Sequence, residues 1–213
     1  MASVLAIVVL SYLLGSVPTS IIVSKVLKGI DIREYGSRNA GATNVYRVLG
    51  LRAALFVGAI DVGKGVAAVL LVTRLHTGDV PISPELIRVI SGTAVVCGHI
   101  WTVFAGFRGG KAVNTSLGVV FALAPVAAVV CLGIWMVTTF STRYVSVGSM
   151  SAAGALPIVL AIHKFFLRGE VSYEVFVFGC VASLLVLVTH RSNIDRLLRG
   201  QENRFGTRGG GSP

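Results

Sequence analysis

The chain is a series of long apolar runs separated by short polar segments. A helix that crosses a bilayer needs about 20 mostly apolar residues, because each residue rises only about 1.5 Å. Runs of this kind occupy residues 2–27, 53–75, 85–105, 145–163 and 173–190. The pattern predicts an all-α, polytopic helical bundle in a membrane. Residues 1–205 are expected to form one membrane-embedded domain, and 206–213 a flexible tail.

A further apolar stretch, 112–141, is longer than one crossing requires. Pro125 lies near its middle, where it removes a backbone donor and disfavours helix at the residue before it. The stretch is therefore either one long kinked helix or two short helices, 112–123 and 126–141. A 12-residue helix rises only about 18 Å against a hydrocarbon core of about 30 Å, so such a helix must be shielded by protein.

The distribution of basic residues distinguishes these two alternatives. With two helices the chain crosses seven times, and an external N-terminus leaves 14 Lys and Arg on the cytoplasmic side and 4 outside. With one helix it crosses six times, and the counts become 10 and 8. Because Lys and Arg concentrate in cytoplasmic loops, the sequence predicts seven transmembrane helices, the N-terminus outside and the C-terminus cytoplasmic.

Composition excludes several classes of protein. Hydrophobic residues make up 54%, charged residues 13%, and the mean hydropathy is +0.82. Soluble domains carry about 25% charged residues, so a soluble enzyme, a disordered chain and a fibrous protein are excluded. The net charge of +10 arises from residues between the apolar runs. This placement favours orientation in a membrane, or attraction of anionic substrates, over nucleic-acid binding.

Three unusual polar segments fall on the predicted cytoplasmic side. The first, 36–47, reads GSRNAGATNVYR and offers the side chains of Ser37, Thr43, Asn44 and Arg47. Glycines let successive backbone N–H groups turn toward one anion, and the guanidinium adds charged donors. Because a glycine loop alone is a weak signal, an ordinary polar turn is the alternative.

The second segment, 105–116, reads AGFRGGKAVNTS and places Gly109, Gly110 and Lys111 before a predicted helix. Two glycines, a lysine and a helix N-terminus together favour a site for an anion. The first glycine and the spacing of an ATP-binding P-loop are missing, so ATP hydrolysis is not expected. The alternative is a basic anchor at the membrane surface.

The third segment, 189–205, begins where the last apolar run ends. On a helix, His190 and Asn193 are three residues apart and share a face. A neutral histidine there could act as a base or hold a hydroxyl group. The alternative is an interfacial histidine followed by a basic amphipathic tail.

Charges inside the apolar runs are costly and require partners. Asp61 and Lys64 are three residues apart in the second run, and we expect them to pair with each other or with the polar loops and to support the site. His99, next to Trp101 near the end of the third run, is either part of an interfacial aromatic belt or a group that supports the site residues, and we favour the belt.

Taken together, these segments resemble the bacterial acyl-phosphate:glycerol-3-phosphate acyltransferases, the PlsY family. Six blocks match in order over almost the whole chain, at residues 12–20, 35–50, 61–65, 98–111, 143–146 and 190–205. The resemblance implies a membrane enzyme that moves a fatty acyl group from acyl phosphate to the 1-hydroxyl of sn-glycerol 3-phosphate. Lysophosphatidic acid and phosphate would be the products, in the first step of phospholipid synthesis.

The resemblance also assigns roles to individual residues. It implies that Ser37, Lys111, His190 and Asn193 are catalytic. The substrate-binding residues would be Arg47, Thr43, Asn44, Gly109, Gly110 and Glu202. One block departs from the family, which usually has GGKG followed by V-A-T, whereas this chain has GGKA followed by Val113, Asn114 and Thr115. If the position of Ala112 requires a positive φ or close approach to phosphate, alanine would impair it.

No cofactor and no metal are expected. The implied partners are glycerol 3-phosphate, fatty acyl phosphate and membrane lipid, together with the enzyme that forms acyl phosphate; nucleic acid is not among them. The implied location is the cell inner membrane, with the active site facing the cytoplasm.

The chemistry favours direct attack without a covalent acyl-enzyme, because acyl phosphate is already activated. The proton of the attacking hydroxyl group would pass to His190 or to an oxygen of the donor's phosphate, and both routes remain open. The acyl tail is expected in a groove between spans. A transporter of a phosphorylated metabolite that uses the same basic pocket is the alternative function, and a non-catalytic scaffold is a third.

Overall fold

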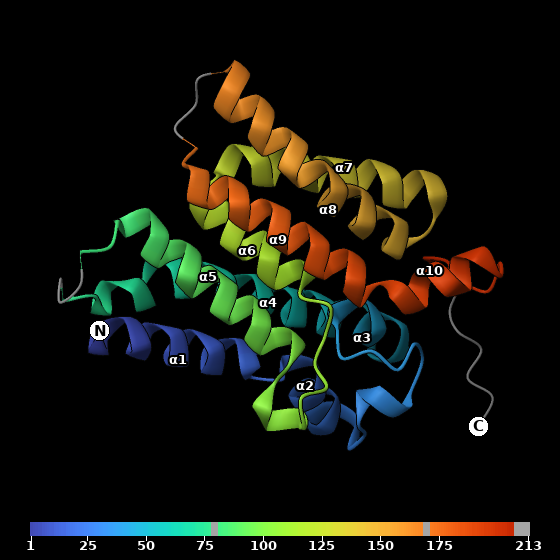
Figure 1. Ribbon diagram of the computed structural model, residues 1–213. Coiled ribbons are helices and arrows are strands. Elements are labelled where there is room, and N and C mark those ends of the chain that lie inside the picture. Colours follow the sequence, from blue (N-terminus) through green and yellow to red (C-terminus); the bar gives the residue numbers. More distant parts are fainter. Residues whose placement is uncertain (78–80, 168–170, 207–213) are drawn as a thin grey trace.

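The computed structural model describes residues 1–77, 81–167 and 171–206, and this part of the chain is helical with short connections (Figure 1). Its α-helices are α1 (Ala2–Ser16), α2 (Thr19–Lys28), α3 (Ala42–Leu49), α4 (Leu51–Leu70), α5 (Pro84–Ile100), α6 (Val113–Leu123), α7 (Pro125–Thr142), α8 (Val145–Ala161), α9 (Tyr173–Thr189) and α10 (Arg191–Leu198). Single turns of tighter or wider helix, η1 (Ile32–Glu34), η2 (Val72–Leu75), η3 (Val103–Ala105) and η4 (Ile162–Phe166), flank them.

Within the described residues, five helical segments are long and apolar enough to cross a membrane: Ala2–Lys28, Leu51–Leu75, Pro84–Ala105, Pro125–Thr142 and Val145–Phe166. The pair α9 and α10, bent by 52°, counts as a sixth if it is taken as one span. Helix α6 is apolar but has only 11 residues. The protein is therefore an all-helical integral membrane protein, and the predicted fold class is confirmed at that level. The predicted tail over 206–213 lies outside the described residues except for Gly206.

Two predicted boundaries need correction. The first apolar run is not one helix, because the chain breaks at Val17 and Pro18 between α1 and α2. The stretch 112–141 does form two helices, but α7 is not short and has 18 residues. Pro125 begins α7, where its missing N–H group costs no intrahelical hydrogen bond, so the helix extends to Thr142.

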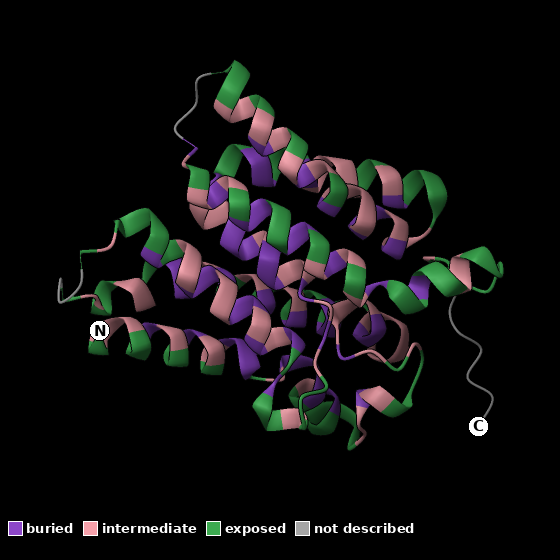
Figure 2. Cartoon of the chain, viewed as in Figure 1, coloured by how far each residue is buried: buried purple, intermediate pink, exposed green. Residues whose placement is uncertain are grey.

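The helices pack closely where small residues meet backbone. Helix α1 lies against α5, and a Cβ atom on Gly98 would stand 2.1 Å from the carbonyl oxygen of Tyr12. Helix α6 lies against α4, and a Cβ atom on Gly118 would stand 2.0 Å from the carbonyl oxygen of Val62. Close contact between backbones is the usual way in which membrane helices associate. Figure 2 shows buried residues gathered in the middle of the bundle, around α6 and α9, with exposed residues on the outward faces.

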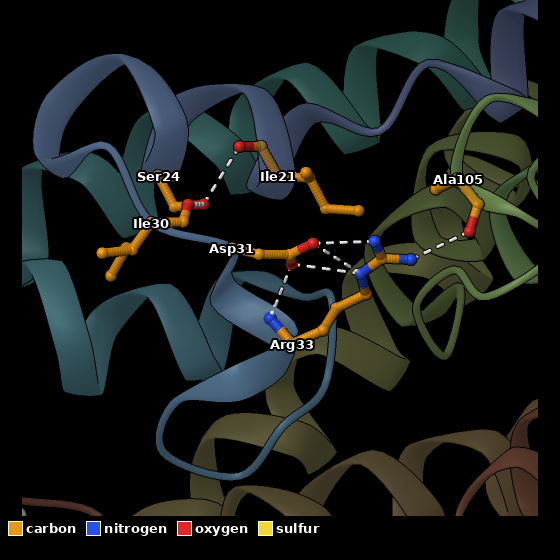
Figure 3. A network of polar contacts seen from close by, with 6 residues as sticks. All are labelled: Ile21, Ser24, Ile30, Asp31, Arg33 and Ala105. Carbon is orange, nitrogen blue, oxygen red and sulfur yellow. Dashed lines mark hydrogen bonds and ion pairs between the residues drawn. The ribbon is translucent and has the colours of Figure 1, made fainter.

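The connection from α2 to α3 is tied to the connection from α5 to α6. The Arg33 guanidinium forms an ion pair with Asp31, at 2.7 Å, and its Nη1 donates to the carbonyl oxygen of Ala105 at 2.8 Å (Figure 3). The Ser24 hydroxyl lies 3.0 Å from the carbonyl oxygens of Ile21 and Ile30, and closes the end of α2. These contacts place the loop that precedes α3 beside η3.

A buried ion pair holds the break in the first run. The side chains of Asp61 and Lys64 are 3% and 4% exposed, and Lys64 Nζ donates to Asp61 Oδ1 at 2.8 Å. The same ammonium donates to the carbonyl oxygen of Val17 at 2.5 Å. That carbonyl lies at the end of α1, where helix geometry leaves acceptors without partners. The predicted pairing of the two charges is confirmed, and the pair also satisfies the backbone at the break.

The interpretation of His99 as an interfacial belt residue is wrong. Its side chain is 10% exposed, and Nδ1 lies 3.8 Å from Asp61 Oδ1. The same nitrogen lies 3.1 Å from the Thr115 hydroxyl on α6. His99 therefore points into the protein and connects α5 to α4 and α6, whereas the neighbouring Trp101 is 46% exposed.

We expect Lys64→Met to destabilise the protein strongly. The substitution leaves the Asp61 carboxylate buried without its counter-charge, and removal of one partner of a buried pair costs about 3–5 kcal/mol. The midpoint of thermal unfolding in detergent should fall well below that of the wild type. The double variant Asp61→Asn/Lys64→Met carries no unpaired charge and should regain part of the loss. Equal midpoints for Lys64→Met and the wild type would contradict the role of this pair.

Candidate functional site

A polar cavity of about 100 Å³ lies where the three predicted segments meet. Its walls come from the loop before α3 and from α3, the start of α6, the start of α8, and the region from the end of α9 to the tail. The polar side chains that line it include Ser37, Asn39, Thr43, Asn44, Arg47, Lys111, Asn114, Ser146, His190, Asn193 and Glu202. Every predicted site residue is in this set except Gly109 and Gly110. The structure thus brings together residues from opposite ends of the sequence.

Asn44 shapes the glycine loop. The side chain is 1% exposed, and its Oδ1 accepts a hydrogen bond of 2.8 Å from the Ser37 amide. Its Nδ2 faces the carbonyl oxygens of Ile32, Tyr35 and Asn39 at 3.0, 2.9 and 3.1 Å. This amide group is therefore committed to the loop, and a direct contact with substrate is not supported. The side chains of Ser37 and Thr43 are left to face the cavity.

Gly109 and Gly110 do not form the expected cradle of amides. The Gly109 amide donates to the carbonyl oxygen of Ile100 at 3.0 Å, and the Gly110 amide donates to that of His99 at 3.1 Å. Both donors are therefore occupied, and neither residue lines the polar cavity. A Cβ atom on Gly109 would lie 2.0 Å from the carbonyl oxygen of His99. These glycines let the loop pack on the end of α5, and so we do not assign them to phosphate binding.

The position of Ala112 does require a positive φ, the possibility considered from the sequence: its backbone is left-handed, with φ of 57°. A non-glycine residue there costs about 1–2 kcal/mol. Ala112 precedes α6 and offers no side-chain cap, and the first backbone bond of the helix runs from the Ser116 amide to the Ala112 carbonyl. The amides of the first turn therefore lack intrahelical partners. Since Val113 and Asn114 line the cavity, the positive end of α6 adjoins it.

A chain of hydrogen bonds fixes Lys111 from the opposite wall. Lys111 Nζ donates to Asn193 Oδ1, and Asn193 Nδ2 donates to Glu202 Oε1 at 2.6 Å. Glu202 also accepts from Arg196 Nε at 2.7 Å and from the Ser146 hydroxyl at 2.8 Å. Burial acts to raise the pKa of Glu202, but these hydrogen bonds outweigh it and hold the pKa below its usual value. Glu202 is thus a charged residue that orients its neighbours, since each of its oxygens is already bonded.

The segment after α10, residues 199–205, folds back and places Glu202 in the cavity wall. The ring of Phe205 stacks on Tyr46 of α3 with centroids 5.3 Å apart, and meets the edge of Phe140 of α7 at 6.0 Å. The Phe205 amide donates to the carbonyl oxygen of Arg143 at 2.6 Å. Residues 202–205 therefore close one wall of the cavity.

His190 has one ring nitrogen free for chemistry. The side chain is buried, and Nδ1 lies 2.7 Å from the carbonyl oxygen of Val186. Because a carbonyl only accepts hydrogen bonds, Nδ1 carries a proton, and a neutral ring then has its lone pair on Nε2. Nε2 has no hydrogen-bond partner in the part of the chain that the structure describes. It is available to accept a proton or a hydroxyl group in the cavity.

The cavity holds positive charge that the protein does not neutralise. The pKa of Lys111 is lowered to about 8, mainly by burial and also by the charges of Arg196 and Arg47, against the opposing effect of Glu202. Burial likewise lowers the pKa of Arg47, which forms no ion pair within the described residues. An anion in the cavity would relieve this repulsion, so the site favours binding of phosphate groups.

An apolar groove of about 130 Å³ continues from the polar cavity. It runs between α6, α7, α8 and α9, and is lined by residues such as Leu117, Val120, Ala128, Leu132, Leu156 and Ala182. Val113, Asn114, Trp135 and Ser149 line both spaces. The combined site suits a molecule with an anionic head and an apolar tail.

The sequence of this chain matches a known protein family over nearly its full length. Residues 5–200 match the sequence model of the family described as glycerol-3-phosphate acyltransferase. The chain belongs to this family. The resemblance seen in the sequence is thereby confirmed, and the protein is a glycerol-3-phosphate acyltransferase.

Relatives and solved structures agree with this assignment. Glycerol-3-phosphate acyltransferases from Chlorobium limicola and Chlorobaculum tepidum are 45% and 44% identical to it, each over 96% of this chain and 97% of theirs. Two crystal structures of PlsY (YgiH), described as an integral membrane glycerol 3-phosphate acyltransferase, are 38% identical over 96% of both chains. The glycerol 3-phosphate form superposes with a TM-score of 0.83, and the lysophosphatidic acid form with 0.81.

Several residues of the acyltransferase cavity were not singled out from the sequence. They include Asn114 and Ser146, to which no role in the site was assigned from the sequence; Asp61, which was expected to support the site, and His99 also line the cavity. Asn114 could have been found by its place in the first turn of α6, directly after the Gly-Gly-Lys segment. Ser146 follows a bend between two apolar runs, and only the folded chain shows that it meets Glu202.

The affinity of the free enzyme for glycerol 3-phosphate should depend on the protonation of Lys111. A bound phosphate dianion favours the ammonium form, so affinity should fall above about pH 8, by up to about tenfold per pH unit. Titration calorimetry in detergent between about pH 7 and 9.5 would measure it. Lys111→Arg, which stays charged over this range, should bind with little pH dependence. A flat profile for the wild type would contradict the lowered pKa.

Proposed function

We propose that this acyltransferase moves a fatty acyl group from acyl phosphate to the 1-hydroxyl of sn-glycerol 3-phosphate and forms lysophosphatidic acid and phosphate. The observation that carries the proposal is the continuity of a cationic cavity with an apolar groove between spans. The forms named for the solved relatives, with glycerol 3-phosphate and with lysophosphatidic acid, fit the polar part and the combined space respectively.

Two phosphate groups must occupy the cavity together, and their mutual repulsion has to be offset. Lys111 and Arg47 supply positive charge, and the first turn of α6 supplies backbone amides. Ser37 and Thr43 add hydroxyl donors from the loop before α3. Asn193 and Glu202 hold Lys111 in place, which lets the ammonium act without reorganisation.

The reaction is a direct acyl transfer. The 1-hydroxyl oxygen attacks the carbonyl carbon, the bond from that carbon to the phosphate oxygen breaks, and phosphate leaves with the electron pair. The hydroxyl proton passes to His190 Nε2 or to an oxygen of the departing phosphate. Orientation of bound reactants is worth up to about 7–11 kcal/mol in well-aligned cases, so little covalent assistance is required. No described cysteine lines the polar cavity, and Ser37 is assigned to binding.

Seven crossings with a cytoplasmic site agree best with the arrangement of the chain. The N-terminus and α10 lie at opposite ends of the bundle, as an odd number of crossings requires (Figure 1). The short helix α6 packs against α4, α5, α7 and α9, which shield its backbone from lipid. The cavity lies at the end that carries most of the basic residues, and the positive-inside rule assigns this end to the cytoplasm of the inner membrane. Membrane lipid and the enzyme that forms acyl phosphate are the proposed partners.

A reconstituted assay tests the reaction. Purified protein in detergent micelles is incubated with palmitoyl phosphate and labelled glycerol 3-phosphate, and labelled lysophosphatidic acid is measured. A transporter or a scaffold would form no lysophosphatidic acid, because neither catalyses acyl transfer. Micelles enclose no second compartment, so transport cannot contribute to the signal. Palmitoyl-CoA in place of palmitoyl phosphate tests the donor, and product from the thioester alone would contradict the proposal.

His190→Ala should reduce turnover by about 10²–10⁴-fold if Nε2 is the base, and by less if it only positions the hydroxyl. The measurement is kcat in the same micelle assay at saturating substrates. His163→Ala provides the matched control, because His163 lies in η4, away from the cavity. Turnover close to that of the wild type in His190→Ala would dismiss both roles.

A further inference from the structure

The boundary between the polar cavity and the apolar groove is where the reacting carbonyl group must lie. In an acyl phosphate, the carbonyl carbon and one bridging oxygen separate the phosphate from the tail. With the phosphate beside Lys111 and the tail in the groove, the carbonyl oxygen falls among the residues that line both spaces. These residues are Val113, Asn114, Trp135 and Ser149.

Few donors are available at this boundary. Val113 is apolar, and the Ser149 hydroxyl already donates to the carbonyl oxygen of Val145 at 2.9 Å. The side chains of Asn114 and Trp135 form no hydrogen bond within residues 1–77, 81–167 and 171–206. Asn114 stands in the first turn of α6, three residues after Lys111, so its amide lies next to the phosphate side of the boundary.

The surrounding helices make room for the Asn114 amide. A Cβ atom placed on Gly58 of α4 would lie 3.3 Å from Asn114 Nδ2 and 3.9 Å from the Cβ atom of Ala42 in α3. Ala42 and Asn114 both line the polar cavity, so the amide lies beside Gly58 at the cavity wall. The absence of a side chain at Gly58 therefore leaves room for a polar group that has no partner of its own.

We propose that the Asn114 side-chain amide is a further catalytic group, which donates a hydrogen bond to the carbonyl oxygen of the acyl phosphate. As the acceptor oxygen bonds to the carbonyl carbon and the bond to phosphate breaks, negative charge develops on that carbonyl oxygen. The electron pair then leaves with phosphate, and the proton goes to His190 or to phosphate as above. A neutral, preorganised donor stabilises this charge more in a low-dielectric site than water does. The inference rests on the proposed function.

The first test is Asn114→Ala. Removal of one oxyanion donor typically lowers kcat by about 10²–10³-fold, and we expect a loss of at least about tenfold here. The KM for glycerol 3-phosphate should change by less than about twofold, because the amide serves the acyl carbonyl and not the acceptor's phosphate. Thermal unfolding in detergent should be unchanged, since alanine is a good helix former.

Gly58→Ala tests the position of the amide without removing it. The new methyl group would crowd Nδ2, so kcat should fall by about three- to tenfold, although alanine favours the helix. In the Asn114→Ala background the same change should have no further effect on kcat, as coupling between contacting residues requires. Gly63→Ala is the matched control on α4, because a Cβ atom there meets nothing within 4 Å, and its kcat should match the wild type.

Three outcomes would overturn the proposal. A kcat within about threefold of the wild type for Asn114→Ala would show that the donor is not used. A raised KM for glycerol 3-phosphate with kcat unchanged would make Asn114 a ligand of the acceptor. Additive losses of kcat in the Gly58→Ala/Asn114→Ala double variant would show that Gly58 does not act through the Asn114 amide. In all three cases the wild type still forms lysophosphatidic acid, whereas failure of the proposed function leaves the wild type inactive.

Discussion

The position of the whole site depends on one buried ammonium group. Lys64 Nζ binds the Asp61 carboxylate and the carbonyl oxygen of Val17, where the first span breaks. Through Asp61 the same network reaches His99, and through His99 it reaches the first turn of α6. A charge inside a membrane protein is tolerated only when such partners surround it. The network therefore fixes the relation between α1, α4, α5 and α6, and with it the start of the helix that adjoins the cavity.

The cavity contains more positive than negative charge. The two carboxylate oxygens of Glu202 accept hydrogen bonds from Arg196, Asn193 and Ser146, so Lys111 and Arg47 have no carboxylate as a direct partner among the described residues. Their mutual repulsion and their burial both disfavour the empty site. A phosphate ligand removes both costs, so part of the binding energy comes from relief of electrostatic strain already present in the protein.

The sequence predicted the helical class and most spans, because each apolar run is long enough to cross a bilayer by itself. It did not predict the break at Val17 and Pro18, because the run as a whole is apolar enough to be taken for one helix although Ser16 and Thr19 flank the break. It also misjudged α7, whose first residue is a proline that the helix accepts. In both cases the outcome depends on where a proline falls relative to a helix start.

The site, too, could be predicted from the sequence only in part. Side-chain chemistry and resemblance identified Lys111, His190 and Glu202, which the fold gathers around one cavity. The roles of Asn44, Gly109 and Gly110 could not be obtained in this way, because the partner of each amide depends on loop conformation. His99 was misplaced because the rotation of a helix about its axis is set by packing on neighbours. The role proposed for Asn114 depends on packing in the same way, since its amide lies beside Gly58 of α4.

The packing of residues 199–205 onto α3 and α7 has a consequence for the biogenesis of the protein. Ser37 and Arg47 are translated well before His190 and Glu202. A nascent polypeptide that has inserted only its earlier helices thus contains cationic residues but lacks the wall that orients them. The complete site therefore forms only after residues 190–205 have been made, when Phe205 packs against the aromatic rings of two helices that were translated long before it.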